Sequence, residues 1–201
     1  MPRTTAACYP KDHTERVQSG PLVSSPCSNG VLAGQSLPFT LDTAANMGPD
    51  GVFELEGQSD PAACEVEMAS LFSKAACDQE PCSFNGVYMP PIDKSQLMGF
   101  SGFYYSVLNT EKLFGQKVRA DYALFAQLTE QLCSMTYAEL QSLNSQSGAN
   151  LPKAFLTNQC FTNVYMRQLL NNYGIQSFDR LKITDKVSKL AGVGRERTGA
   201  C

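Results

Sequence analysis

Cysteine is the residue type in this sequence whose number and spacing could support chemistry. The 201 residues contain eight cysteines and a single histidine, His13. Cysteines can bind zinc, exchange electrons or form structural disulfides, and each use has its own spacing. Zinc sites usually combine two close pairs, each with two intervening residues. The closest pair here, Cys77 and Cys82, has four intervening residues and no nearby histidine. The spacing therefore argues against a zinc site.

The same two cysteines do not match a redox-active pair. Thioredoxin-like sites have two intervening residues and lie at the start of a helix, whereas Cys77 and Cys82 precede a strand-like segment. A redox protein is therefore a poor fit. Because the eight cysteines are spread along the chain, they indicate an oxidised, exported protein rather than free, buried thiols in the cytosol.

Familiar catalytic groups are missing from the sequence. A serine or cysteine nucleophile would need an imidazole base, and His13 lies in a stretch that is typical of a solvated loop. A phosphate-binding loop of the form G-x4-G-K-[ST] does not occur. Neighbouring carboxylates such as Glu54 and Glu56 fit a solvated edge. We therefore expect neither catalytic residues nor metal ligands in this chain.

Composition narrows the possible partners. The formal net charge of −3 gives no electrostatic reason to bind nucleic acid. No window approaches the roughly 18 apolar residues that a membrane span needs, and the N-terminus lacks the apolar core of a signal peptide. We expect a secretory-pathway protein, extracellular or membrane-anchored, whose signal or anchor belongs to a portion outside this sequence.

Helices dominate the elements that must position any functional residue. The hydrophobic periodicity predicts helices over 61–74, 96–113, 118–134, 136–143 and 157–173, and strands over 52–55, 84–89 and 180–184. Asp60 is the expected cap of the first helix, Thr136 and Glu139 form a capping box, and Gly174 is the expected stop of the last helix. Residues 1–50 form a loop-rich segment in this prediction, 51–185 a lobe, and 186–201 a divergent, flexible tail. Strands alternating with helices predict an α/β lobe, and strands so few would leave its sheet incomplete.

The helix predicted over 96–113 carries an aromatic run. Its apolar residues follow the i, i+3, i+4 rule and would form the buried stripe: Phe100, Phe103, Tyr104, Val107 and Leu108. Tyr105 lies at the edge of that stripe. This position favours an exposed, functional ring over a core residue.

Five landmarks in one order resemble the C-terminal lobe of the apyrase family, the ecto-nucleoside triphosphate diphosphohydrolases. The stretch from Cys77 to Pro91 resembles that family's Cys-x4-Cys-[Ser/Ala]-Phe-Asn-Gly-[Val/Ile]-x-x-Pro block, and Phe100 to Tyr105 resembles its fifth conserved region. The other landmarks are the Cys8 segment, the helix around Cys64, and the Cys133 and Cys160 region. The resemblance runs from about residue 8 to 185.

The resemblance implies a fold and an activity for a longer protein. Such enzymes have two RNase H-like lobes of the actin-like superfamily around a cleft, so this chain would be a partial, helix-rich C-terminal lobe with few short strands and disulfides. Complete enzymes hydrolyse nucleoside tri- and diphosphates with a divalent cation, Ca²⁺ or Mg²⁺. The partners implied are these nucleotides and the missing N-terminal lobe.

Particular residues take roles from the same resemblance. Tyr105 corresponds to the tyrosine that stacks on the nucleotide base, and Ser101 to its neighbouring polar contact. Gln159 stands where the family has the opposite stacking tyrosine. The implied disulfides are Cys77–Cys82, Cys133–Cys160 and Cys27–Cys64, which leaves Cys8 and Cys201 without assigned partners.

Two hypotheses follow for the function. The Asp-x-Gly-Ser phosphate motifs and the catalytic glutamate region of the family are absent, so the chain resembles a fragment that supplies the base-binding side of the cleft and is inactive alone. The alternative is a non-catalytic, secreted, disulfide-rich binding module derived from such an enzyme. Gln159 and the divergent tail favour the alternative.

Overall fold

The computed structural model describes residues 3–18, 52–72, 80–82, 87–89, 97–179 and 181–185. Helices dominate these residues, and the strands are short, as the sequence predicts. The helices are α2 (Pro61–Ser70), α3 (Gly102–Phe114), α4 (Tyr122–Cys133), α5 (Tyr137–Gln146) and α6 (Lys153–Asn172). The strands are β1 (Arg3–Ala6), β2 (Thr14–Gln18), β3 (Val52–Gly57), β4 (Leu97–Gly99) and β5 (Leu181–Ile183).

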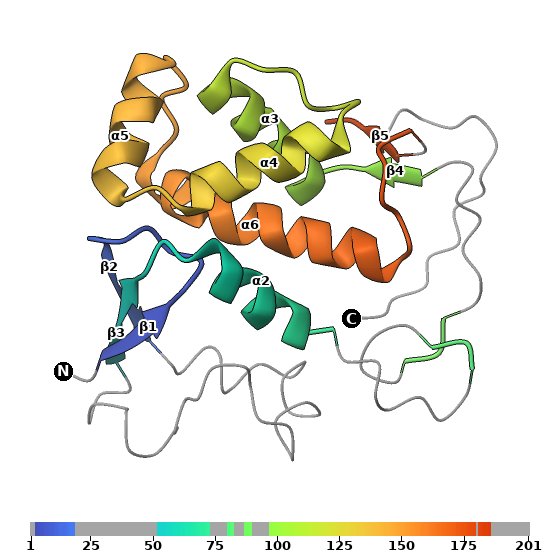
Figure 1. Ribbon diagram of the computed structural model, residues 1–201, viewed down its shortest axis with the longest axis horizontal. Coiled ribbons are helices and arrows are strands. Elements are labelled where there is room, and N and C mark those ends of the chain that lie inside the picture. The colour runs from blue at the N-terminus through green and yellow to red at the C-terminus, as the bar shows by residue number, and fades with distance from the viewer. Residues whose placement is uncertain are drawn as a thin grey trace, which may run out of the picture.

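Helix α6 is the central element of the fold. It contacts α2, α3, α4 and α5, and in Figure 1 it runs through the middle of the molecule with α3 and α4 on one side and α2 on the other. One small sheet has the strand order β1-β3-β2, with β1 parallel and β2 antiparallel to β3. The parallel pair β4–β5 lies at the opposite end of the molecule (Figure 1).

Capping residues set several helix ends, and those at Asp60, Thr136 and Gly174 were predicted from the sequence. The Asp60 carboxylate accepts a hydrogen bond from the Ala63 backbone N–H at 2.9 Å at the start of α2, and Asp121 caps α4 in the same way. The predicted capping box at the start of α5 is present. Gly174 has a φ of 69°, a left-handed conformation that suits glycine, and follows the end of α6.

The helix predicted over 96–113 is wrong at its first turn. Residues 97–99 form β4, which pairs with β5, and the helix begins only at Gly102. Ser101, with a φ of 53° and a ψ of −115°, turns the chain between the strand and the helix. The apolar run of 97–100 therefore belongs partly to a strand, and Phe100 is 50% exposed rather than part of the helical core stripe.

Other predicted boundaries also need correction. Residues 1–50 were expected to be loop, but β1 and β2 lie among them, and 19–50 lie outside the described residues. Helix α4 begins at Tyr122 rather than 118, because Asp121 provides the cap. Helix α6 begins at Lys153, about one turn before the predicted start. Most of the strand predicted over 84–89, and the predicted tail of 186–201, lie outside the described residues.

The disulfides join the N-terminal sheet to the helices. Cys133 bonds to Cys160, the pair that the family resemblance implied, and Cys64 bonds to Cys8. The expected Cys27–Cys64 pairing is therefore wrong, because the turn after β1 places Cys8 within 4.8 Å of Cys64 between their Cα atoms. Cys82 is disulfide-bonded as well, and its expected partner, Cys77, lies outside the described residues.

The two buried disulfides lie against each other in one part of the core. The sulfur atoms of Cys64 and Cys160 are 3.9 Å apart. Neither sulfur carries a hydrogen, so this is a packing contact rather than a hydrogen bond. Leu132, Leu140 and Val164 belong to the same cluster, which thereby joins α2, α4, α5 and α6. A second cluster, around Val107, Phe125, Met166 and Phe178, fills the space between α3, α4 and α6.

Short polar contacts hold the N-terminal sheet on the helices. The Ser59 hydroxyl donates to the Met135 carbonyl at 2.6 Å and accepts from the Lys11 backbone N–H at 2.7 Å. Gly57 is required here, because a Cβ atom would lie 2.0 Å from the carbonyl oxygen of Pro10. The sheet therefore packs as part of the same lobe as the helices.

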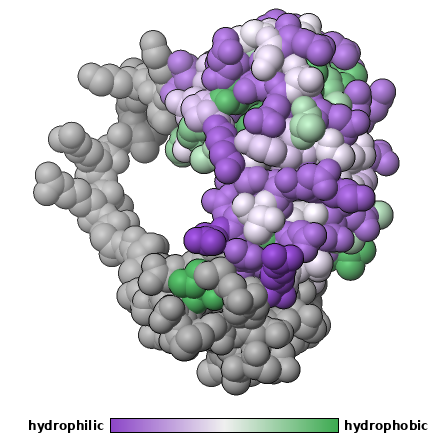
Figure 2. Space-filling view, turned by 90° about the vertical axis from the view of Figure 1, so that its left-hand side faces the viewer, coloured by the Kyte–Doolittle hydropathy of each residue, from purple (hydrophilic) through white to green (hydrophobic). Residues whose placement is uncertain are grey.

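His13 is buried, contrary to the solvated position expected from the sequence. It is 4% exposed, its Nε2 lies 3.1 Å from a Glu15 carboxylate oxygen, and its ring centroid is 5.0 Å from that of Tyr137. His13 is therefore buried because it packs between the small sheet and α5. The face that carries these elements is mostly hydrophilic at its surface (Figure 2). Among the described helices, none is both long and apolar enough to cross a membrane.

Candidate functional site

The start of α3 presents the two residues to which the sequence assigns binding. Strand β4 leads directly into this turn and is held by β5, with the Thr184 N–H donating to the Gly99 carbonyl at 2.9 Å. Ser101 occupies the N-cap position, but its hydroxyl makes no capping hydrogen bond. Tyr105 follows one turn later, and its N–H donates to the Ser101 carbonyl at 3.0 Å. Both residues are exposed.

Tyr105 has the exposure that its off-stripe position predicts. The residue is 56% exposed, while the neighbouring Tyr104 is half-buried. The two rings meet edge to face, with centroids 5.3 Å apart, and the Arg119 guanidinium lies 5.2 Å from the centre of the Tyr104 ring. Arg119 in turn pairs with the buried carboxylate of Glu111, with 3.2 Å between Nε and Oε2. Tyr105 is therefore an exposed ring on an ordered support.

A cavity lies beside this turn, which we call the α3–α6 cavity. It has a volume of about 330 Å³ and is bounded by the end of β4, the first turns of α3 and the middle of α6. Ser101, Ser106, Phe103, Thr162 and Met166 are among its lining residues, and Tyr105 is not. The cavity and the exposed Tyr105 ring thus share the first turn of α3 but are separate surfaces.

Gln159 is turned into the protein interior. It is 2% exposed, its Oε1 accepts from Asn109 Nδ2 at 3.0 Å, and its Nε2 donates to the Ser106 carbonyl at 3.0 Å and to Asn163 Oδ1 at 2.8 Å. Asn163 continues the network by donating to the hydroxyl of Thr110 at 2.9 Å. The side chain of Gln159 therefore forms part of the hydrogen-bonded contact between α3 and α6. It offers no surface on which a base could stack.

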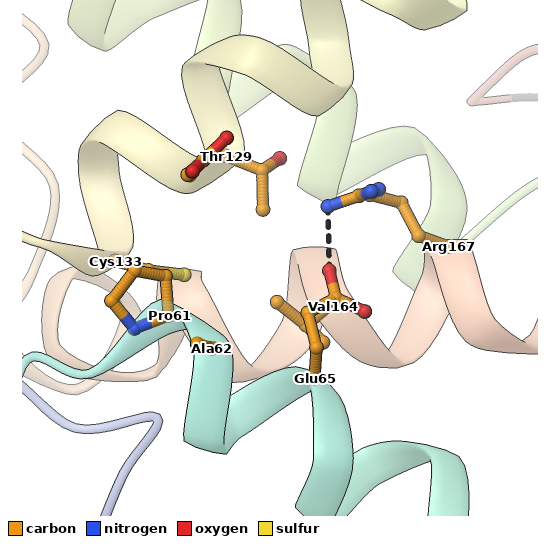
Figure 3. A pocket seen from close by; sticks show the side chains of 8 residues that line it. Pro61, Ala62, Glu65, Thr129, Cys133, Val164 and Arg167 are labelled. Carbon is orange, nitrogen blue, oxygen red and sulfur yellow. Dashed lines mark hydrogen bonds and ion pairs between the residues drawn. The ribbon is translucent and has the colours of Figure 1, made fainter.

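A second cavity, of about 240 Å³, lies between α2, α4 and α6 (Figure 3). Arg167 spans its edge and donates to Glu65 Oε1 at 2.6 Å, while Arg167 Nε is buried without a partner. The Thr129 hydroxyl is already used, because it donates to the Phe125 carbonyl at 2.8 Å. Burial raises the pKa of the nearby Tyr122, and the Arg167 charge opposes that rise. These contacts join the three helices.

The described residues do not offer a metal site. Within the described ranges, no group of three His, Cys, Asp or Glu side chains is placed to hold a cation. The buried carboxylate of Glu111 is occupied by the Val118 N–H and by Arg119. The divalent cation that the family resemblance implies for a complete enzyme therefore does not fit the donors described here, and we assign it no ligand in this part of the chain.

The structure places at a cavity several residues to which the sequence assigned no binding role. Ser106, Thr162, Tyr165 and Met166 form walls of the α3–α6 cavity. Tyr165 and Met166 follow Thr162 by three and four residues on α6, which places both near Thr162 on one helical face. That spacing is a signal for a shared face but does not distinguish a cavity wall from the core.

Comparison with known proteins identifies the family. The sequence matches the GDA1/CD39 (nucleoside phosphatase) family over residues 4–192, and the chain belongs to this family. It is 33% identical over 175 residues to human ectonucleoside triphosphate diphosphohydrolase 3, an alignment that covers 84% of this chain and 28% of that protein. It is 30% identical over 164 residues to mouse ectonucleoside triphosphate diphosphohydrolase 2, an alignment that covers 82% of this chain and 30% of that protein.

Coverage is uneven between the chain and its relatives. Mouse ectonucleoside triphosphate diphosphohydrolase 1 is 25% identical over 197 residues, which cover 90% of this chain and 37% of that protein. The chain therefore spans less than two-fifths of the length of these relatives. Its similarity to them is a similarity to one part of each.

Proposed function

We propose that this chain supplies the base-binding side of the cleft in a nucleoside tri- and diphosphate hydrolase. The observation that carries the proposal is the exposed ring of Tyr105, one turn after the uncapped hydroxyl of Ser101, in a member of a nucleoside phosphatase family. A base would lie flat on the Tyr105 ring, and the Ser101 hydroxyl could donate to or accept from the edge of the base.

Stacking sets the expected strength and selectivity of this contact. A base on an aromatic side chain contributes about 1–3 kcal/mol, and every base offers a π-face. Gln159 is buried in the α3–α6 contact, so the second face of the base would have to be covered by another part of a complete enzyme. The isolated chain is therefore expected to bind nucleotides weakly and with little preference among bases.

The remainder of the activity would come from the rest of the enzyme. The fold proposed is part of an RNase H-like C-terminal lobe, in which the short β4–β5 pair would be extended by further strands. The phosphate-binding loops, the water-activating acid and the bound Ca²⁺ or Mg²⁺ would belong to the missing N-terminal lobe and the shared cleft. We propose that this chain alone does not hydrolyse nucleotides.

An oxidising compartment fits the same proposal. The Cys8–Cys64 and Cys133–Cys160 disulfides are typical of secreted and extracellular proteins. The relatives are named as ecto-enzymes. We propose that the complete protein passes through the secretory pathway and is extracellular or membrane-anchored.

The test of base binding is a titration of the disulfide-bonded chain with AMP and ADP, followed by NMR. We expect the signals of the first turn of α3 to shift, and Tyr105→Leu to weaken binding by about fivefold or more. Phe155→Leu is the matched control, because Phe155 is an exposed ring on α6, 59% exposed. Equal affinity in wild type and Tyr105→Leu would contradict the proposal.

Hydrolysis requires a separate test. Phosphate release from ATP and ADP, measured with Ca²⁺ and with Mg²⁺, should not exceed the blank for this chain. Robust turnover would show that the catalytic residues lie within these 201 residues after all.

The alternative function is a non-catalytic, secreted, disulfide-bonded binding module. The buried position of Gln159 favours it, because half of the family's base sandwich is missing. The source transcript distinguishes the two. An upstream reading frame that encodes Asp-x-Gly-Ser motifs supports the enzyme, whereas translation that starts at Met1 supports the module.

A further inference from the structure

We propose that the α3–α6 cavity is a binding site for a small, uncharged aromatic molecule with one hydrogen-bonding substituent, of the phenol class. The cavity shares Ser101 with the proposed base-binding surface, but Tyr105, the ring on which a base would stack, does not line it. The inference is argued from Ser106 and the apolar walls and does not depend on nucleotide binding.

The walls of the cavity suit a flat, apolar guest. Phe100, Phe103 and Tyr165 contribute rings, and Met98 and Met166 contribute thioethers. Aromatic rings favour edge-to-face and offset contacts with another ring, and the flexible, polarizable methionine side chains adapt to its outline. A ring that enters this space would replace water against apolar surface on several sides.

One buried hydroxyl in the wall is unpartnered. Ser106 is 1% exposed and lines the cavity, and its Oγ has no hydrogen-bond partner. The Ser106 carbonyl, by contrast, already accepts from the Thr110 hydroxyl at 2.8 Å and from Gln159 Nε2 at 3.0 Å. A buried polar group without a partner is rare and costly. A ligand that supplies one donor or acceptor to Ser106 Oγ would remove that penalty.

The hydroxyl of Thr162 in the cavity wall already has a hydrogen-bond partner. Thr162 lines the same cavity, but its Oγ1 donates to the Asn158 carbonyl at 2.8 Å. Ser101 also lines the cavity but is exposed, so among the described lining residues Ser106 has the buried hydroxyl without a partner. Because one buried hydroxyl lacks a partner in an otherwise mostly apolar wall, we expect a ring with a single polar substituent rather than a polyol or a peptide.

Charge and size restrict the ligand further. None of the described residues that line the cavity is Asp, Glu, Lys or Arg, so a charged ligand would lose its hydration without gaining a counter-ion. Its volume of about 330 Å³ exceeds the roughly 150 Å³ of an engineered apolar cavity that holds benzene. One substituted ring system fits, whereas a nucleotide phosphate is disfavoured.

The rim allows entry and is partly ordered before binding. Phe100 is 50% exposed and Tyr165 is 39% exposed, so the lining of the cavity includes solvent-accessible rings. The Tyr165 ring stacks on Phe161, with an interplanar angle of 12°, and also contacts the ring of Phe72. Little side-chain freedom remains to be lost at this wall when a ligand binds.

The experiment titrates the complete, disulfide-bonded chain with phenol and, in parallel, with benzene, which has the ring without the hydroxyl. The methyl signals of Met98 and Met166 report occupancy directly in NMR spectra of methionine-labelled protein. We expect saturable shifts with both probes and about fivefold tighter binding of phenol, the effect of one hydrogen bond. Absence of saturable shifts, or equal affinities for the two probes, would overturn the proposal.

Variants of the chain separate the contribution of the Ser106 hydrogen bond from that of the apolar walls. Ser106→Ala should abolish the preference for phenol while benzene still binds. Gly102→Leu should weaken binding of both probes, because Gly102 lines the cavity and a Cβ there meets nothing within 4 Å, so the larger side chain is accommodated at the wall. Tyr105→Ala should leave both affinities unchanged, as should Ser145→Ala on the exposed side of α5. A phenol preference retained in Ser106→Ala, undiminished binding in Gly102→Leu, or binding lost in Tyr105→Ala would refute the assignment.

Discussion

Replacing Gln159 by leucine should destabilise the lobe far more than its conservative shape suggests. The substitution removes the acceptor for Asn109 Nδ2 and the donors to the Ser106 carbonyl and to Asn163 Oδ1. The Ser106 carbonyl keeps the Thr110 hydroxyl as a partner. In the described part of the chain, the Asn109 amide nitrogen and the Asn163 amide oxygen have no replacement partner and would be left buried.

The magnitude follows from these two groups. Each buried polar group left without a partner costs about 1–3 kcal/mol, so the loss in the free energy of unfolding should be about 2–6 kcal/mol. A domain of ordinary stability has about 5–15 kcal/mol in total, so the effect would be large. Urea unfolding with intact disulfides measures it, provided that the slope of the transition is unchanged.

A double-mutant cycle tests the reason as well as the size. Asn109→Leu combined with Gln159→Leu removes both members of one hydrogen bond, so the pair should cost less than the sum of the single changes. Gln141→Leu, on the exposed side of α5, is the matched control and should change stability by less than about 0.5 kcal/mol. If Gln159→Leu unfolds at the same urea concentration as wild type, the network does not stabilise the lobe as we reason.

Two further changes test buried and exposed carboxylates. Glu111→Gln should lower the free energy of unfolding by about 1–3 kcal/mol, because the buried carboxylate accepts from the Val118 N–H and pairs with Arg119; urea unfolding measures the loss. Hydrogen bonds from the Thr136 backbone N–H and then its hydroxyl lower the pKa of Glu139 below its usual 4.5. The capping contribution should therefore be fully present above pH 4.5 and be lost as the pH falls through the folded-state value, and Glu139→Gln should flatten this part of the stability profile.

Matched changes separate these effects from general loss of charge. Glu130→Gln on the exposed side of α4 should leave the urea midpoint unchanged, unlike Glu111→Gln. For the pH profile, Thr136→Val removes the hydroxyl but keeps the backbone N–H, so it should weaken the acid dependence less than Glu139→Gln does. A Glu139→Gln profile parallel to wild type below pH 4.5 would contradict the assigned cause.

The sequence predicted the elements whose signals are local. Asp60, the Thr136 capping box and Gly174 act within one or two turns of their own positions, and the structure has each of them at a helix end. The exposure of Tyr105 followed from helical periodicity alone, because its neighbours fix which face is buried. Such features require no knowledge of distant partners.

The errors arose where a distant partner decides the local structure. Residues 97–99 have the apolar character of a helix start, but pairing with β5, more than 80 residues later, makes them a strand. The choice of Cys8 rather than Cys27 as the partner of Cys64 depends on how β1 lies beside β3. His13 is buried because Tyr137 packs on it. None of these pairings has a signal in the neighbouring sequence.

The proposed site depends on α6 more than on its own sequence neighbours. Cys160 fixes the register of α6 against α4 through its bond to Cys133, and the adjacent Gln159 fixes α6 against α3 through the Ser106 carbonyl. Ser106 is the residue after Tyr105 in the first turns of α3. A shift of α6 would therefore move the cavity wall at Met166 and the support of the exposed ring together. Gln159, which the family resemblance predicts at the place of a second stacking ring, is thus part of the contact that supports the turn carrying Tyr105.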